Sequence, residues 1–208
     1  MARETRQRIL DASLAMFNAQ GEPNVTTNHI ADELEISPGN LYYHFRNKDD
    51  IIEQLFAVYE QRMDAALAAP DGRLPGLEDV WLQLHLVFEC IWDYRFLYRD
   101  LVDILSRNRR LRMRFARILR RADEQAHAVM RGLVQAEVMR ASASEVDAAS
   151  TNILVIATFW LNYAAARGDK DEQTSIRDGI VQVMMLIAPF LRDAERVHLN
   201  TLTRAYID

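Results

Sequence analysis

The stretch between residues 26 and 45, which reads TTNHIADELEISPGNLYYHF, constrains the fold of this 208-residue chain more than any other. Thr26 or Thr27 can cap a first short helix. The apolar residues of that helix recur at helical spacing: Ile30, Ala31 and Leu34. Ser37 then suits the N-cap of a second helix, and Pro38 suits its first position, where a missing N–H costs nothing. The stretch therefore predicts two short helices joined by a tight turn.

The second helix, from Pro38 to His44, is barely two turns long and predicts an unusual surface. Leu41 and Phe45, which are four residues apart, would face inward. The remaining side chains would point outward: Asn40, Tyr42, Tyr43 and His44. Aromatic rings on a short exposed helix are costly to leave in water unless a partner docks there. A helix-turn-helix that presents its second helix to the DNA major groove explains this arrangement.

The motif ISPGNLYYHF at residues 36–45, followed by Lys48, resembles the TetR family of bacterial transcriptional regulators. The resemblance implies a helix-turn-helix DNA-binding domain over residues 1–47 and a ligand-binding and dimerisation domain over residues 48–208. One position departs from the family. Glu35 stands in the turn where family members often carry Gly, and a left-handed residue there costs Glu about 1 kcal/mol more than Gly.

The helix geometry and the resemblance together give nine candidate DNA-binding residues. Gly39 would let the backbone approach base edges, and Tyr42 would reach a thymine methyl group or stack on a sugar. By resemblance, Asn40 is a further base-contact candidate, and Ser37 and Pro38 belong to the same surface. Four more match positions that usually contact phosphates: Thr27, Tyr43, His44 and Lys48. The alternative is that one of the two tyrosines packs against the first helix of the chain.

The positions of the basic residues support DNA binding, whereas the net charge of the chain does not. The formal net charge of −5 argues against indiscriminate binding to nucleic acid. Residues 1–48 hold five basic and six acidic side chains. The basic ones stand at the two ends of the module, where family members meet phosphates: Arg3, Arg6, Arg8, Arg46 and Lys48.

The rest of the chain predicts an all-α protein, because prolines and glycines are few and no alternating strand pattern appears. We expect about nine or ten helices, with the three-helix DNA-binding module first and a helical bundle after it. Helical patterns occur over residues 4–20, 48–63, 77–91, 109–140, 144–166, 173–191 and 194–206, with a short helix or turn over 94–105 and loops over 69–76 and 168–172.

Three features predict a cytoplasmic protein with no membrane partner. The single Cys90 fits a reducing compartment. The N-terminus is polar and charged, unlike a signal peptide. The longest apolar run, Ile153–Leu161, is far short of the roughly 20 residues that cross a bilayer.

Two helical segments are apolar around most of their circumference, Ile153–Leu161 and Ile180–Leu191. Such a helix has to be covered on both sides, and in a chain of this size a second copy is the expected cover. The resemblance implies the same, because the eighth and ninth helices of the family build a homodimer interface with their two-fold mates. The alternative is a central core helix that needs no partner.

The resemblance also implies a pocket for a small-molecule effector in the C-terminal bundle. Polar candidates border the apolar stripes, with two tryptophans as walls: His85, Glu89, Asn152, Tyr163, Trp92 and Trp160. Arg95 and Arg99, set among aromatic residues, are candidates for a partly buried anion site. Each of these side chains could instead have a purely structural role. Residues 93–121 hold ten arginines against three acids, and we expect most of them to pair with acids elsewhere.

A narrower resemblance, to the PhaD-type regulators of polyhydroxyalkanoate gene clusters, would favour an acyl thioester or fatty acid as effector. Repressors are most frequent in the TetR family, but PhaD-type regulators can be activators. Two other classes compete. One is a purely structural dimeric bundle, which would leave the exposed Tyr42, Tyr43 and His44 unexplained. The other is an enzyme, because two Glu-x-x-His pairs match the number in a di-iron carboxylate bundle: Glu124 with His127, and Glu195 with His198. We expect no enzyme, cofactor or metal. The expected function is a homodimer that binds a pseudo-palindromic operator on double-stranded DNA, and whose effector changes the spacing of the two DNA-reading helices.

Overall fold

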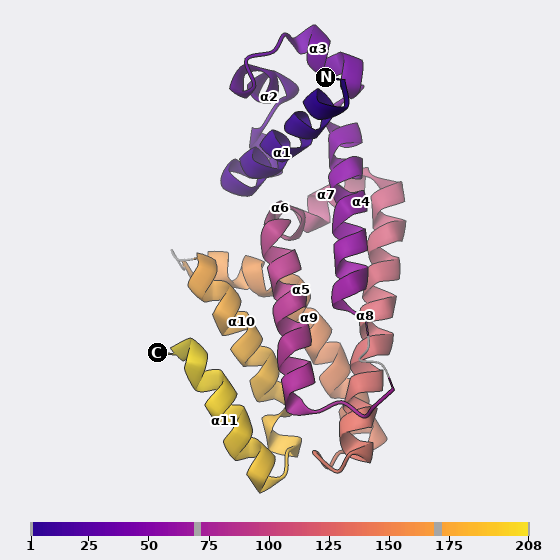
Figure 1. The fold of residues 1–208 in the computed structure, drawn as a ribbon, viewed down its shortest axis with the longest axis vertical. Helices are drawn as coiled ribbons and strands as arrows, with labels where there is room; N and C mark the ends of the chain where they lie inside the picture. The colour runs from indigo at the N-terminus through magenta and orange to yellow at the C-terminus, as the bar shows by residue number, and fades with distance from the viewer. Residues whose placement is uncertain (1, 69–71, 169–171, 208) are drawn as a thin grey trace. The chain divides into compact units, whose positions relative to one another are not determined.

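The computed structural model describes residues 2–68, 72–168 and 172–207, and all of its regular elements are helices (Figure 1). The α-helices are α1 (Ala2–Gln20), α2 (Thr27–Glu33), α3 (Pro38–His44), α4 (Lys48–Ala66), α5 (Leu77–Asp93), α6 (Arg95–Arg99), α7 (Leu101–Arg107), α8 (Arg109–Gln135), α9 (Ala143–Arg167), α10 (Glu172–Ile187) and α11 (Asp193–Ile207). Two 3-10 helices complete them, η1 (Glu22–Asn24) and η2 (Ala188–Phe190). The predicted all-α class is confirmed.

Several details differ from the sequence prediction. The region predicted as one short helix or turn forms two helices, α6 and α7, so the predicted eighth and ninth helices are α9 and α10. Helix α8 ends at Gln135, earlier than predicted, and Glu137 beyond it has a left-handed φ of 59°. The predicted loops at 69–76 and 168–172 include residues 69–71 and 169–171, which lie outside the described residues.

The chain divides into two compact units that are not contiguous in sequence. The first unit, called here the DNA unit, comprises residues up to 62 together with 93–114. The second unit, called the bundle unit, comprises residues 63–92 and those from 115 onward. The division follows packing, because α6 contacts α1 within the DNA unit. The domain boundary at residue 47 is a statement about function and stays a prediction.

Aromatic side chains form the core of the DNA unit. Phe17 of α1 packs on Phe96 of α6, with 5.3 Å between the ring centres. Tyr59 of α4 and Tyr98 of α6 are buried, and their hydroxyl groups lie 2.6 Å apart, which is hydrogen-bond distance. Helix α6 is thus packed with both α1 and α4.

In the bundle unit, α9 and α10 pack against each other. Gly179 of α10 allows this packing, because a Cβ atom there would lie 2.7 Å from both Phe88 Cε1 of α5 and Trp160 Cδ1 of α9. The buried Trp160 indole N–H donates a hydrogen bond to the carbonyl oxygen of Ser175. No helix within the described residues is long and apolar enough to span a membrane.

Candidate nucleic-acid interface and effector cavity

Helices α2 and α3 each begin with a side-chain cap, as the sequence predicts. Thr26 Oγ1 accepts a hydrogen bond from the His29 amide at 3.2 Å, and His29 Nδ1 accepts one from the Thr26 amide at 3.4 Å. Thr26, and not Thr27, is therefore the cap. At the start of α3, Ser37 Oγ accepts from the Asn40 amide at 3.2 Å, and Pro38 holds the first helical position. These caps pair backbone donors that the helices leave free.

The turn between α2 and α3 is left-handed at Glu35, whose φ is 54°. The Ile36 amide donates to the Ala31 carbonyl at 3.0 Å and closes the end of α2. Glu35 therefore has the left-handed conformation that glycine adopts at less cost. The turn fixes the direction in which α3 leaves α2.

Helix α3 presents its aromatic residues outward. Leu41 and Phe45 are buried, and the Arg6 guanidinium lies 4.9 Å from the centre of the Phe45 ring. Tyr43 is 80% exposed and Tyr42 is 49% exposed. The predicted inward face is confirmed, and so is the outward position of Asn40, Tyr42 and Tyr43, whereas His44 is half-buried. The alternative, that a tyrosine packs into the fold, does not hold for Tyr43.

Other candidate residues lie on the same surface. The hydroxyl groups of Tyr42 and Thr27 are 3.0 Å apart, so α2 and α3 present these two residues together. Gly39 and Asn40 are exposed. A Cβ atom at Gly39 would meet only Ser37 Oγ, at 3.9 Å, so packing does not require glycine there. The open space above Gly39 is available to a bound molecule. The His44 ring is half-buried and edge-on to Tyr43, with 5.1 Å between ring centres.

Lys48 has a different environment from the other candidates. Its Nζ atom donates to the carbonyl oxygens of Glu22, at 2.9 Å, and Val25, at 3.0 Å. It also lies 2.8 Å from Glu22 Oε1, and the side chain is only 23% exposed. A phosphate would have to compete with these internal partners. The phosphate contact of Lys48 stays a prediction, as do the DNA contacts of the other eight residues.

Two capped helices joined by a tight turn, with rings exposed on the second, define a helix-turn-helix protein. Comparison with known proteins identifies the family. Residues 9–55 match the profile described as "Bacterial regulatory proteins, tetR family", and residues 58–199 match the TetR profile described as "Bacterial transcriptional repressor". The chain belongs to the TetR family of DNA-binding transcriptional regulators.

Curated relatives match a little over a third of the chain. The HTH-type transcriptional regulator TtgW of Pseudomonas putida is 36% identical over 80 residues, which are 38% of this chain and 57% of TtgW. The regulator AcrR of Shigella flexneri is 31% identical over 75 residues, which are 36% of this chain and 35% of AcrR. The matches thus span between about a third and three fifths of these relatives.

Solved structures match the whole chain. A TetR-family regulator from Marinobacter aquaeolei VT8 is 38% identical, covers 97% of this chain and 98% of its own, and has a TM-score of 0.88. The SmeT–triclosan complex is 20% identical, covers 92% of this chain and 94% of its own, and has a TM-score of 0.60. The second similarity shows the fold alone.

The effector role of the candidate residues in the bundle unit stays a prediction, and their exposure differs. Glu89, Asn152 and Tyr163 are exposed in the bundle unit. His85 Nδ1 lies 2.9 Å from the Trp81 carbonyl oxygen, Trp160 is buried, and Trp92 is half-buried. These residues do not line the cavity of about 160 Å³ that the structure forms in this unit. The sequence therefore did not predict that cavity.

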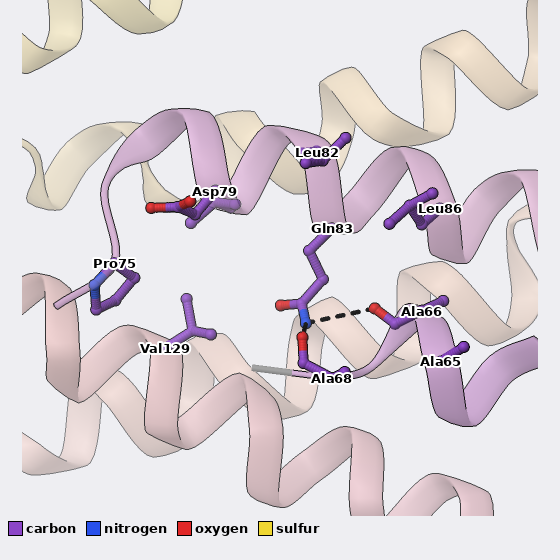
Figure 2. Close-up of a pocket in the computed structure, with 10 residues that line it drawn as sticks. Ala65, Ala66, Ala68, Pro75, Asp79, Leu82, Gln83, Leu86 and Val129 are labelled. Carbon is purple, nitrogen blue, oxygen red and sulfur yellow. Dashed lines mark hydrogen bonds between the residues drawn. The ribbon is translucent and has the colours of Figure 1, made fainter. Parts of the chain in front are cut away.

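The cavity lies where α5, α8 and the end of α4 meet (Figure 2). Its walls are mainly apolar: Ala65, Pro75, Val80, Leu82, Leu86 and Val129. Two polar side chains reach it, Asp79 and Gln83. Asp79 is paired with Arg73 and accepts from the Gly76 amide at 2.8 Å. Gln83 Nε2 is 3.5 Å from the carbonyl oxygens of Ala66 and Ala68, a length at which hydrogen bonds are weak.

Arg95 and Arg99 belong to the DNA unit and are partly buried. Burial lowers the pKa of both guanidinium groups below the ordinary value, and the neighbouring Arg95 charge lowers the pKa of Arg99 further. Arg99 Nη1 donates to the Asn18 carbonyl at 2.9 Å, so α1 already binds one of the two candidates. Their role as an anion site stays a prediction.

Four of the ten arginines in the 93–121 segment are seen to pair with acids, and the expectation that most of them do so stays a prediction. Arg107 pairs with Glu22, Arg110 with Glu53, Arg114 with Glu60, and Arg121 with Asp64.

The two Glu-x-x-His pairs lie in separate surroundings. His127 Nε2 is 3.2 Å from Asp147 Oδ1, and His198 Nε2 is 3.3 Å from Glu78 Oε1. Within residues 2–68, 72–168 and 172–207, no three His, Cys, Asp or Glu side chains are grouped so as to hold a metal ion.

Proposed function

We propose that the chain is a ligand-responsive repressor that binds a pseudo-palindromic operator as a homodimer. The observation that carries the proposal is the surface of α3, where Tyr42 and Tyr43 are exposed on a helix that its cap and the left-handed turn hold in place. A bacterial regulator of this kind would act in the cytoplasm, and its chemistry would be binding and not catalysis.

An exposed apolar stripe on α9 supports the homodimer. Val155, Phe159 and Tyr163 recur every four residues along the helix, and each is about half exposed. Met185 of α10, which packs with α9, is also exposed. Apolar side chains at this spacing share one helix face, and covering them with a second copy removes them from water.

The cavity beside Gln83 supports a small, largely apolar effector. Its walls would bury a short aliphatic or aromatic body, and the Gln83 amide would hydrogen-bond one polar group. A short acyl group, as the PhaD-type resemblance suggests, has this chemistry. SmeT, another protein with the same fold, has been solved in complex with the small molecule triclosan.

An effector would switch DNA binding by changing the distance between the two α3 helices of the homodimer. A homodimer reads two half-sites about 34 Å apart, so a small change in the separation of its two α3 helices loses selective binding. An effector that binds one separation better than the other shifts the population between them.

The test is binding of the purified protein to DNA from upstream of its own gene, at two salt concentrations and with unrelated DNA as competitor. We expect selective binding that weakens steeply with salt, and that Tyr42→Ala reduces by tenfold or more. The matched control is Val102→Ala, which shortens another exposed side chain of the DNA unit outside the proposed surface. Binding that is unselective, or that Tyr42→Ala leaves intact, would overturn the proposal.

A further inference from the structure

A row of polar contacts joins the end of α1 and η1 to the segment 93–107 within the DNA unit. Asn18 is buried, and its side chain donates to the Asp93 carbonyl at 2.8 Å and accepts from the Phe96 amide at 3.1 Å. Arg99 Nη1 donates to the Asn18 carbonyl at 2.9 Å. The side chains of Asn18 and Arg99 thus join the backbone at the end of α1 to the segment around the start of α6.

Glu22 lies at the centre of the next part of this row. It is fully buried, and its amide donates to Asp100 Oδ2 at 2.9 Å. Its carboxylate pairs with Lys48 at 2.8 Å and accepts a hydrogen bond from Arg107. Burial by itself raises the pKa of Glu22, but the hydrogen bonds from Arg107 and Lys48 outweigh it and lower the pKa below the ordinary value. The buried carboxyl group is therefore ionised near neutral pH.

These partners bracket the helix-turn-helix segment. Lys48 Nζ binds the carbonyl oxygens of Glu22 and Val25, which come just before α2. Lys48 is itself the first residue of α4, just after α3. Arg107 is the last residue of α7. Glu22, which lies just before α2, is thus bound through its carboxylate to Lys48, just after α3, and to Arg107 at the end of α7.

Stability alone is a weak reason for this arrangement. Burying a charged pair costs desolvation that its attraction often only offsets, and an apolar replacement of similar volume is often as stable. A buried ion pair does, however, specify one geometry, because each charge has to meet its partner. The cluster is therefore better suited to fixing position than to adding stability.

We propose that Glu22 is a positioning residue for DNA binding, which holds the two ends of the α2–α3 segment in register with α7. The proposal rests on the proposed function of α3 as the DNA-reading helix. It gives Lys48 an internal role through Glu22.

The test compares Glu22→Gln, Lys48→Met and the control Arg110→Gln with the unmodified full-length protein. Arg110 also pairs with a glutamate, Glu53, but its side chain is largely exposed. Binding to DNA from upstream of the gene is measured over a series of salt concentrations. We expect Glu22→Gln to weaken binding by tenfold or more without changing the slope of log affinity against log salt, Lys48→Met to weaken binding at least as much, and Arg110→Gln to stay within twofold.

Hydrogen exchange of the same proteins separates local positioning from general destabilisation. We expect the amides of α2 and α3 to exchange about tenfold faster in Glu22→Gln, and the amides of α9 to exchange as in the unmodified protein. An equal acceleration in α9 would mean that Glu22 only supports the fold, and would overturn the proposal.

The salt series has its own contradicting result. If Lys48→Met lowers the slope by about 0.9 for each lost phosphate contact while Glu22→Gln binds normally, Lys48 binds DNA directly and the proposal is wrong. If the unmodified protein shows no selective binding, the proposed function fails. The exchange of α2 and α3 in Glu22→Gln still decides whether Glu22 positions that segment.

Discussion

Each of the two compact units is stabilised internally by a different kind of contact. In the DNA unit, segments far apart in sequence are joined by a buried charge cluster at Glu22 and by the buried Asn18 amide. In the bundle unit, α5, α9 and α10 meet by close apolar packing around Gly179. Charge clusters fix position and respond to pH, whereas close packing responds to volume. The geometry of the unit expected to bind DNA thus depends on oriented polar and charged contacts. The geometry of the unit expected to dimerise depends on the volumes of its packed side chains.

The largest effect should come from adding volume to the bundle unit. Gly179→Ala puts a Cβ atom 2.7 Å from Phe88 and Trp160, two rings with little room to move. We expect a loss of about 3 kcal/mol in the free energy of unfolding, measured by chemical denaturation. In the control, Gly39→Ala, the added Cβ meets open space, so unfolding should change by less than about 0.5 kcal/mol. Equal effects at the two glycines would contradict the packing account.

Removing the buried charge from the DNA unit should have a smaller effect that depends on pH. We expect Glu22→Gln to lower the free energy of opening the DNA unit by about 1.4 kcal/mol at neutral pH, which matches the tenfold faster exchange of α2 and α3, because Lys48 and Arg107 lose an ionised partner. The folded-state pKa of Glu22 is lowered from 4.5, so its stabilisation is fully present above that pH and is lost as pH falls through the folded value.

The measurement is a pair of denaturation series from pH 7 to pH 3. The difference between the two proteins should shrink below about pH 4.5, while Gly179→Ala should show a constant difference. A difference for Glu22→Gln that does not change with pH would mean that the carboxylate is not ionised in the folded protein.

One hydrogen bond, between the hydroxyl groups of Tyr59 and Tyr98, lies inside the aromatic core of the DNA unit. Tyr59→Phe removes the hydroxyl partner of Tyr98, 2.6 Å away, and should lower the unfolding free energy by about 1 kcal/mol. Tyr98→Phe should cost about the same. A double variant that costs clearly less than the sum of the two would identify the shared hydrogen bond, and strict additivity would contradict it.

The smallest expected effect is a gain. Glu35 has a left-handed φ of 54°, a conformation that costs a non-glycine residue about 1–2 kcal/mol. Glycine relieves that cost but loses about 0.5–1 kcal/mol of conformational entropy on folding. We therefore expect Glu35→Gly to raise the unfolding free energy by about 0.5 kcal/mol, measured by thermal and chemical denaturation. A loss of stability would mean that the turn gains something from the glutamate side chain.

Local features of the DNA-binding stretch could be predicted from the sequence, because neighbouring residues determine them. Ser37 caps α3, Glu35 is left-handed, and Leu41 faces inward, each through contacts within a few residues. The family motif added the class of protein. The all-α class followed from helical periodicity along the whole chain.

The rest depends on contacts between distant residues, which periodicity does not report. Glu22 and Arg107 are 85 positions apart, so neither their pairing nor the inward direction of Lys48 could be inferred from local patterns. The cavity beside Gln83 is not predictable from the sequence for the same reason. Small alanines at the end of α4 form part of its wall, and an alanine in a helix does not by itself indicate a pocket.

The most direct test of the account is selective DNA binding by a Tyr43→Ala variant whose fold is intact. Tyr43 is the most exposed of the α3 aromatic residues, at 80%, so the unfolding free energy should change by less than about 0.5 kcal/mol. We expect the affinity of this variant for the upstream DNA to fall by tenfold or more while its stability is unchanged. Unchanged selective binding would contradict it, because α3 would then not be the surface that meets DNA.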